Sequence, residues 1–159
     1  MGKRTLQEWD LFQLRLAKQY STMSKDVSTK VGAVLCDKDS KFVFGLGYNG
    51  FPERIEDSEN HLNDREFKLR NTCHAEINAL NQVHSDLLSY ATTLVVYPFL
   101  PCLGCARHIL KYPRRNMIKR VVTLDYVPER WSNDFKKSRR ILEDAGIEVV
   151  MYPYKGILE

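Results

Sequence analysis

Three side chains in two short stretches have the types and the spacing to hold a metal ion. His74 precedes Glu76 by two residues, and Cys102 and Cys105 form a C-x-x-C pair directly after Pro101. Imidazole nitrogen and thiolate sulfur are ligands that zinc accepts readily. Because three protein ligands leave the fourth tetrahedral position open for water, this set predicts a catalytic zinc.

Glu76 is predicted to lie beside the metal without binding it. Zinc lowers the pKa of a bound water from about 15.7 to roughly 7, which makes hydroxide available at neutral pH. A neighbouring carboxylate can take the proton from that water and pass it to a ring nitrogen and then to a departing amine. The residues therefore predict hydrolytic removal of an amine from a ring, with Glu76 as general acid and base.

Two other interpretations of the C-x-x-C pair remain open at this stage. Such a pair also occurs in structural zinc sites and in redox dithiols. A structural site requires a fourth protein ligand, for which Cys36 and Cys73 are the candidates. Neither belongs to a second C-x-x-C, and Cys73 is expected to point away from a metal that is held by His74 on the same helix.

The composition is that of a soluble globular protein. The 159 residues are enough for a single domain with a real core, and 43% of them are hydrophobic and 28% charged. No apolar run approaches the roughly 20 residues of a membrane span, and no export signal is expected. A reduced, cytoplasmic setting fits cysteines that bind metal. The net charge of +4 is mild, and neither a membrane nor a nucleic-acid partner is expected.

Hydrophobic periodicity places the zinc motifs in an alternating chain of elements. Helices are predicted over 5–20, 73–83, from Pro101 onward and 132–145, and strands over 31–36, 42–47, 93–97, 120–124 and 147–151. A hairpin followed by three strands that helices connect predicts a five-stranded mixed sheet with helices on both faces, a three-layer α/β/α sandwich. In such sheets ligands bind beyond the carboxyl ends of strands, where both zinc motifs begin helices.

Three further stretches carry weaker predictions. Thr5 with Glu8 resembles a capping box at the start of the first helix, whose apolar positions are predicted to be core: Trp9, Phe12, Leu16 and Tyr20. Residues 21–30 are predicted to form a polar loop, in which Lys25 and Lys30 are candidates to meet a phosphate. Residues 53–71 are predicted to form a long surface loop with a short helix over 64–69, and His61 within it is interpreted as solvent-exposed.

The placed motifs resemble those of the deoxycytidylate (dCMP) deaminases, in the cytidine deaminase superfamily, from about Ser24 to Val150. Residues 24–33 are similar to the family's first strand and its lead-in, residues 47–52 to its GYNG-x-P element, and residues 73–79 to its zinc helix. H-x-E followed by P-C-x-x-C is the signature of zinc nucleobase deaminases in general. The GYNG-x-P element is therefore the part that discriminates between substrates.

The resemblance implies hydrolysis of dCMP to dUMP and ammonia, which feeds thymidylate synthesis. It implies zinc on the three ligands named above, with Glu76 as the proton shuttle. Asn49 would contact the deoxyribose, and the backbone of Ala75 would help to hold the pyrimidine.

Residues 126–131 resemble a stretch of some bacterial and phage members of the family. Tyr126 is expected to cover the base there, and Arg130 to reach the phosphate. Alternatively, Trp131 packs as a hydrophobic cap on the last helix.

In many members the GYNG-x-P element also takes part in activation by dCTP and inhibition by dTTP. The residues expected to do so here are Gly47, Tyr48, Gly50 and Pro52. Such members are homohexamers that use Mg²⁺ with the effector. Some members carry a second zinc site, for which Cys36, Cys73 and His61 are the residues to test, although they form no convincing ligand pattern.

Other functions remain as alternatives. The chain could deaminate tRNA adenosine or free cytidine, or it could be a non-catalytic zinc module that binds nucleic acid. RNA binding would require a basic face that carries aromatic residues, and the two basic clusters, residues 114–120 and 136–140, are interpreted as solvated helix faces. A riboflavin-pathway deaminase is a weaker alternative, because the reductase domain often fused to it is absent from these residues.

Overall fold

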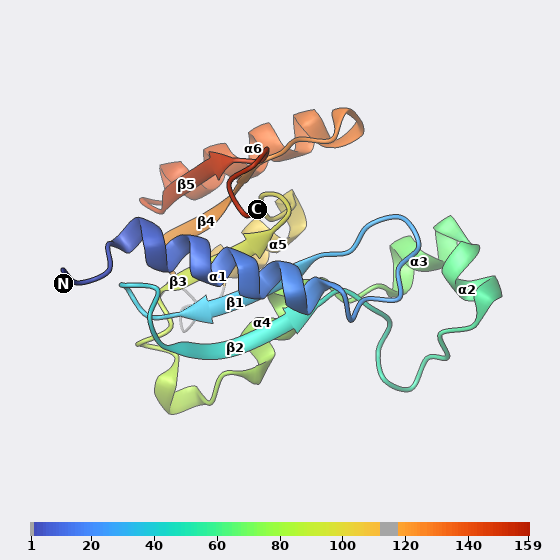
Figure 1. Ribbon diagram of the computed structural model, residues 1–159. Coiled ribbons are helices and arrows are strands. Elements are labelled where there is room, and N and C mark those ends of the chain that lie inside the picture. The colour runs from blue at the N-terminus through green and yellow to red at the C-terminus, as the bar shows by residue number, and fades with distance from the viewer. Residues whose placement is uncertain (1, 112–117) are drawn as a thin grey trace.

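Five strands form one mixed sheet in the computed structural model, which describes residues 2–111 and 118–159 (Figure 1). They are β1 (Gly32–Cys36), β2 (Val43–Tyr48), β3 (Thr93–Tyr97), β4 (Arg120–Asp125) and β5 (Glu148–Pro153), in the spatial order β2-β1-β3-β4-β5. β1 pairs antiparallel with β2 and with β3, whereas β3, β4 and β5 are parallel. The predicted hairpin, parallel trio and mixed five-stranded sheet are confirmed.

Helices cover both faces of this sheet, which confirms the predicted three-layer α/β/α sandwich. One face packs against α1 (Leu6–Ser21) in a core that includes Leu14, Val34 and Val95. The other face packs against α4 (Ala75–Gln82), α5 (Leu103–Lys111) and α6 (Ser132–Asp144). Short 3-10 turns, η1 (Ser85–Leu87) and η3 (Glu129–Trp131), lie in the connections. Among the described residues, no helix is both long and apolar enough to cross a bilayer.

The predicted capping box begins α1, but the predicted buried face of that helix is wrong. Phe12 is 55% exposed, and the other apolar positions of its stripe are only half-buried. The buried positions are instead Asp10, Gln13, Leu14, Ala17 and Ser21. The cause is a close approach to the sheet: a Cβ at Gly32 would lie 1.9 Å from the carbonyl oxygen of Ala17, so the helix turns a small and polar side toward β1.

Asp10 is the centre of a buried polar network that ties α1 to the sheet. Its carboxylate accepts two bonds from Arg120, from Nη2 at 2.8 Å and from Nη1 at 3.2 Å, and it also accepts from the hydroxyls of Ser40 and Tyr152. The interpretation of Arg120 as part of a solvated basic face is therefore wrong, because the side chain is needed inside to neutralise Asp10. Arg114 and Arg115 of the same cluster lie outside the described residues.

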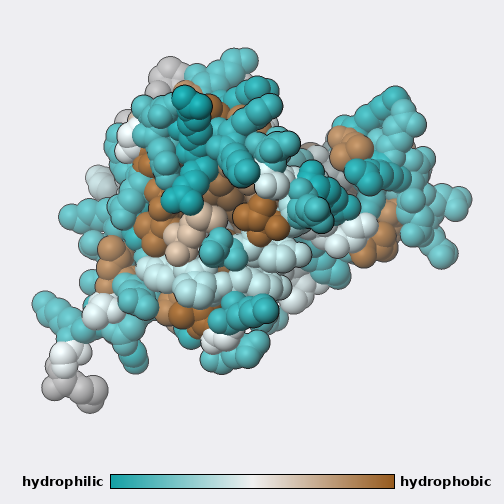
Figure 2. Space-filling view, turned by 90° about the horizontal axis from the view of Figure 1, so that it is seen from above, coloured by the Kyte–Doolittle hydropathy of each residue, from teal (hydrophilic) through white to brown (hydrophobic). Residues whose placement is uncertain are grey.

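Two short helices, α2 (Glu59–Asn63) and α3 (Arg65–Asn71), form an arm that projects beyond the carboxyl ends of β3, β4 and β5 (Figure 1). Figure 2 shows the arm standing out at one end of the body. The face of the molecule seen in this view is largely hydrophilic. The sequence predicted one short helix here, and α2 was missed because it is a single turn capped by Ser58. His61 is half-buried rather than exposed, since its ring stacks on Phe67 at a centroid distance of 4.0 Å.

Candidate active site

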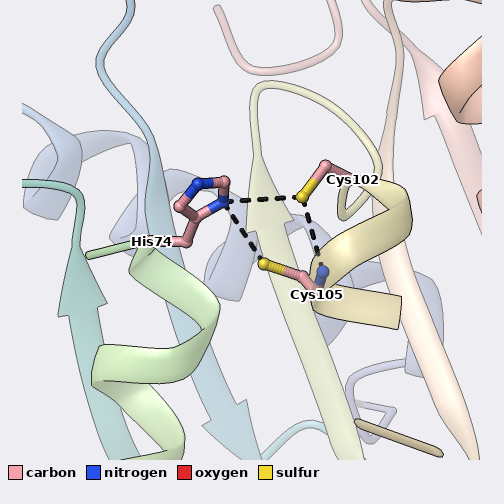
Figure 3. A group of neighbouring side chains, drawn as sticks. All are labelled: His74, Cys102 and Cys105. Atoms are coloured by element: carbon pink, nitrogen blue, oxygen red, sulfur yellow. Dashed lines mark hydrogen bonds between the residues drawn. The ribbon is translucent and has the colours of Figure 1, made fainter. Parts of the chain in front are cut away.

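The two zinc motifs meet at the carboxyl end of β3. His74 is the N-cap residue of α4, whereas Cys102 and Cys105 lie at the start of α5. Nδ1 of His74 lies 3.5 Å from Sγ of Cys102 and 3.3 Å from Sγ of Cys105 (Figure 3). Zinc bonds of about 2.1 Å to nitrogen and 2.3 Å to sulfur in a tetrahedron place those ligand atoms about 3.5 Å apart. The three side chains are therefore arranged as a zinc ion would require.

Within the described part of the chain, this is the one group of three or more His, Cys, Asp or Glu residues that gathers its ligand atoms closely enough for a metal. Cys73 uses its backbone to form a bridge with Gly50 and does not join the group. Cys36 lies in β1 on the face toward α1, on the other side of the sheet from the helices that carry the ligands. Neither cysteine supplies a fourth ligand, and neither forms a second metal cluster with His61.

The pKa values of the three ligand side chains are shifted because these side chains contact one another. The pKa of the Cys102 thiol is lowered to about 4, chiefly because the Cys105 thiol hydrogen-bonds to the thiolate, with His74 as a second partner. The same contact with Cys102 raises the pKa of His74 to about 9, and contact with Cys102 and burial raise the pKa of the Cys105 thiol. A divalent cation would favour the thiolate at both sulfurs, so the donor set fits zinc chemically as well as geometrically.

Glu76 lies in the first turn of α4 and is only 3% exposed. Its Oε2 is 3.7 Å from Sγ of Cys105, so the carboxylate lies beside the ligand group. Burial raises the pKa of Glu76 above its ordinary value. A proton shuttle works best with a pKa nearer neutrality than that of a free carboxylate, and this environment moves Glu76 in that direction.

A cavity of about 560 Å³ opens onto this group. Its walls are the loop before β1, the α2–α3 arm, the start of α4, and the region from η3 into α6. It brings together six of the residues that the sequence singled out: Asn49, His74, Ala75, Glu76, Cys102 and Arg130. Cys105 is 97% buried behind them, as a ligand below the cavity floor.

Asn49 has a structural task that its sequence motif did not reveal. Its Oδ1 accepts from the amide of Val31 at 2.8 Å, and its Nδ2 donates to the carbonyl of Thr29 at 2.9 Å. These bonds fix the loop that enters β1 against the end of β2. One amide hydrogen of Nδ2 is left over, which keeps the predicted contact with a sugar chemically available.

Aromatic side chains line the cavity, but Tyr126 is not among them. Tyr126 stacks against Tyr154 at 4.5 Å and against Phe99 at 6.2 Å. Phe99, Trp131 and Phe135 line the cavity instead, and the Arg130 guanidinium lies 4.3 Å above the Trp131 ring. Trp131 thus packs on the core and lines the cavity at the same time. Phe99 was missed by sequence reasoning, although its position between β3 and the P-C-x-x-C motif is a usable signal.

The GYNG-x-P element divides between two environments. Tyr48, Gly50 and Pro52 line a second cavity of about 450 Å³, where Lys25 is also found. Lys25 pairs with Asp57 at 3.1 Å and does not line the catalytic cavity. Gly47 instead lies under the zinc helix, at a point where a Cβ would be 2.1 Å from a backbone oxygen.

Comparison with known proteins agrees with this geometry. Residues 7–124 match the family described as "Cytidine and deoxycytidylate deaminase zinc-binding region". A deaminase of Aliivibrio fischeri, "Uncharacterized deaminase in luxG 3'region", is 30% identical over 148 residues, which is 93% of this chain and 96% of that protein. The "Probable deoxycytidylate deaminase" of Caenorhabditis elegans is 31% identical over 91% of this chain and 68% of its own length. The human "Deoxycytidylate deaminase" is 31% identical over 65% of this chain and 60% of its own.

Among solved structures, Acinetobacter baumannii RibD superposes with a TM-score of 0.64 at 22% identity. The match covers 96% of this chain but only 37% of the RibD chain, and it shows a shared fold. The family match spans most of the chain and includes all three candidate ligands and Glu76. The protein therefore belongs to the cytidine and deoxycytidylate deaminase family, whose members are zinc-dependent hydrolases.

Proposed function

We propose that this protein hydrolyses dCMP to dUMP and ammonia and so supplies a precursor of thymidylate. The observation that carries the proposal is the buried Glu76 carboxylate, which lies next to the His74, Cys102 and Cys105 group at the floor of an open cavity. Relatives that are named deoxycytidylate deaminases support dCMP as the substrate.

Each residue has a defined part in this reaction. His74, Cys102 and Cys105 would hold zinc, which when bound supplies positive charge that activates water. Glu76 accepts a proton from the attacking water and delivers it to the ring nitrogen. It then takes a second proton from the hydroxyl formed on the ring carbon and passes it to the amine, which leaves as ammonia. The backbone of Ala75 and the side chain of Asn49 would orient the pyrimidine and its sugar. The cavity's aromatic wall would exclude water from the rest of the ring.

The proposal includes regulation and assembly. Activation by dCTP with Mg²⁺, and inhibition by dTTP, would act through Tyr48, Gly50 and Pro52, which line the second cavity. A homohexamer would be the working form. No nucleic-acid or membrane partner is part of the proposal.

The test is an ultraviolet assay of zinc-loaded protein with dCMP, CMP, deoxycytidine, cytidine and dCTP, each with and without dCTP as an activator. We expect dCMP to be the preferred substrate. The Glu76→Gln variant should retain zinc and lose about 10²- to 10⁴-fold in kcat. If all five substrates stay unchanged, the proposed reaction is wrong; if Glu76→Gln is fully active, the shuttle role is wrong.

A further inference from the structure

The catalytic cavity is lined by positive charge that the proposed chemistry at the metal does not use. Arg65 and Lys68 of α3 line this cavity, as does Arg130 of η3. Two carboxylates also line the cavity, Asp26 and Asp134, and both accept hydrogen bonds from backbone amides. The backbone thus holds these carboxylates in place, and of the three cations Lys68 is paired with Asp26.

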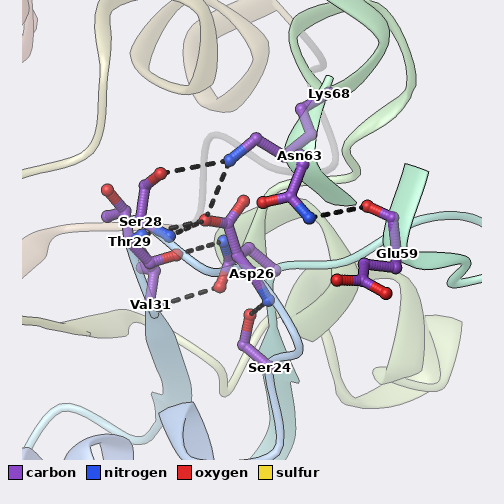
Figure 4. Close-up of polar contacts among 9 residues, drawn as sticks. Ser24, Asp26, Ser28, Thr29, Val31, Glu59, Asn63 and Lys68 are labelled. Carbon is purple, nitrogen blue, oxygen red and sulfur yellow. Dashed lines mark hydrogen bonds and ion pairs between the residues drawn. The ribbon is translucent and has the colours of Figure 1, made fainter. Parts of the chain in front are cut away.

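Lys68 is the most enclosed of the three cations. Its side chain is only 13% exposed, as is that of Asp26, whereas both arginines are exposed. Its Nζ lies 3.4 Å from Oδ1 of Asp26 and 3.2 Å from Oγ of Ser28 (Figure 4). The same Asp26 oxygen accepts shorter bonds from the amides of Ser28 and Thr29, at 2.8 and 2.9 Å.

These distances indicate that Asp26 and Ser28 position the Lys68 ammonium without using all of its hydrogen-bond donors. Charge-assisted N–H···O bonds are usually about 2.7–2.9 Å long, and both contacts of Lys68 are longer. Oδ1 of Asp26 already accepts shorter bonds from two backbone amides, so its contact with Lys68 is the weakest of the three. An ammonium group has three donors, so Lys68 keeps donor capacity for an anion in the cavity. An enclosed cation with long contacts gains stabilisation when an anion joins it.

We infer that Lys68 is the side chain that recognises the 5′-phosphate of the substrate, with Asp26 and Ser28 as positioning residues that hold its ammonium at the cavity wall. The inference rests on the proposed function and adds the selection of a nucleotide over a nucleoside. The competing role for Lys68 is purely structural, as a tie between the arm and the body. Loss of a phosphate contact affects only substrates that carry a phosphate, whereas loss of a structural tie affects all substrates equally.

The experiment compares Lys68→Met with the wild-type enzyme on dCMP and on deoxycytidine. We expect kcat/KM for dCMP to fall about 10- to 100-fold, mainly through KM, because a charge-assisted contact is lost. Deoxycytidine turnover should not change, and Lys68→Arg should restore part of the dCMP activity. The matched control is Arg70→Met, which removes a cation from the same helix together with its exposed ion pair to Glu66 and lines neither cavity.

A calorimetric measurement separates this inference from the proposed reaction. Zinc-loaded Glu76→Gln protein, with and without Lys68→Met, is titrated with dCMP and with deoxycytidine. If Lys68→Met weakens the binding of dCMP but not of deoxycytidine, the inference is supported. This holds even if the wild-type protein turns over neither compound, because that result overturns only the proposed reaction. An equal loss for both compounds, in binding or in turnover, shows a structural tie and overturns the inference.

Discussion

Replacing Gly47 with alanine tests whether the GYNG-x-P element positions the zinc helix. A Cβ at Gly47 would lie 2.1 Å from the carbonyl oxygen of Ala75 and 2.5 Å from the amide nitrogen of Ala79. Both atoms are backbone, so no side-chain rotation relieves the clash. The first turn of α4, which follows His74 and contains Glu76, would have to move by more than about 1 Å to restore van der Waals contact.

Two measurable effects follow from that displacement. Overpacking of this kind costs about 1–3 kcal/mol, which corresponds to a decrease in Tm of roughly 2–12 °C for a chain of this size. A misplacement of about 1 Å near the reacting atoms costs on the order of 10²-fold in rate. We therefore expect Gly47→Ala to have a lower Tm, weaker zinc retention and a kcat reduced by about that factor.

The matched control lies three residues further along the same motif. A Cβ at Gly50 meets its nearest atom at 3.8 Å, an ordinary contact, so Gly50→Ala should keep the Tm, zinc content and kcat of the wild type. Thermal unfolding, metal analysis and the dCMP assay are measured on both variants. Wild-type values for Gly47→Ala would refute the packing argument. If only its response to dCTP changed, Gly47 would act in regulation instead.

Three further predictions concern stability and metal. Asp10→Ala should lower the free energy of unfolding by about 3 kcal/mol in a urea titration, because it leaves the buried Arg120 cation with only the longer contact, 3.6 Å, to the exposed Glu148 carboxylate. Glu143→Ala, which breaks an exposed pair, should cost at most about 0.5 kcal/mol, and equal losses would contradict the reasoning. Burial raises the pKa of the Cys36 thiol from 9.0 to about 12. As pH rises, the unfolded chain therefore loses the Cys36 proton at a lower pH than the folded chain does. The free energy of unfolding of the wild type, relative to Cys36→Ala, should fall by about 1.4 kcal/mol per pH unit between these two pKa values. A difference between the two proteins that is independent of pH would show that the folded chain does not shield the thiol. Chelation should abolish turnover and lower Tm by several degrees, with zinc restoring both, whereas an unchanged Tm would mean that the ligand group holds no metal.

The sequence predicted the elements whose signals are local. The capping box at Thr5, the hairpin after Cys36 and the helix that ends before Gly146 each depend on a few neighbouring residues, and the structure contains all three. The parallel arrangement of β3, β4 and β5 followed because helices connect these strands. The face of α1 could not be predicted in the same way, since the approach permitted by Gly32 is a contact with another element.

The same distinction, between local signals and contacts of distant elements, applies to the candidate site. Residue types and short spacings, H-x-E and C-x-x-C, determined which atoms could hold zinc, because ligand chemistry is a property of the side chains themselves. Only the tertiary structure decided that His74 reaches Cys102 across 28 residues, that Tyr126 stacks outside the cavity, and that Lys68 faces Asp26 within it. Contacts between distant segments depend on how the helices and the arm pack on the sheet, and no local pattern records that packing.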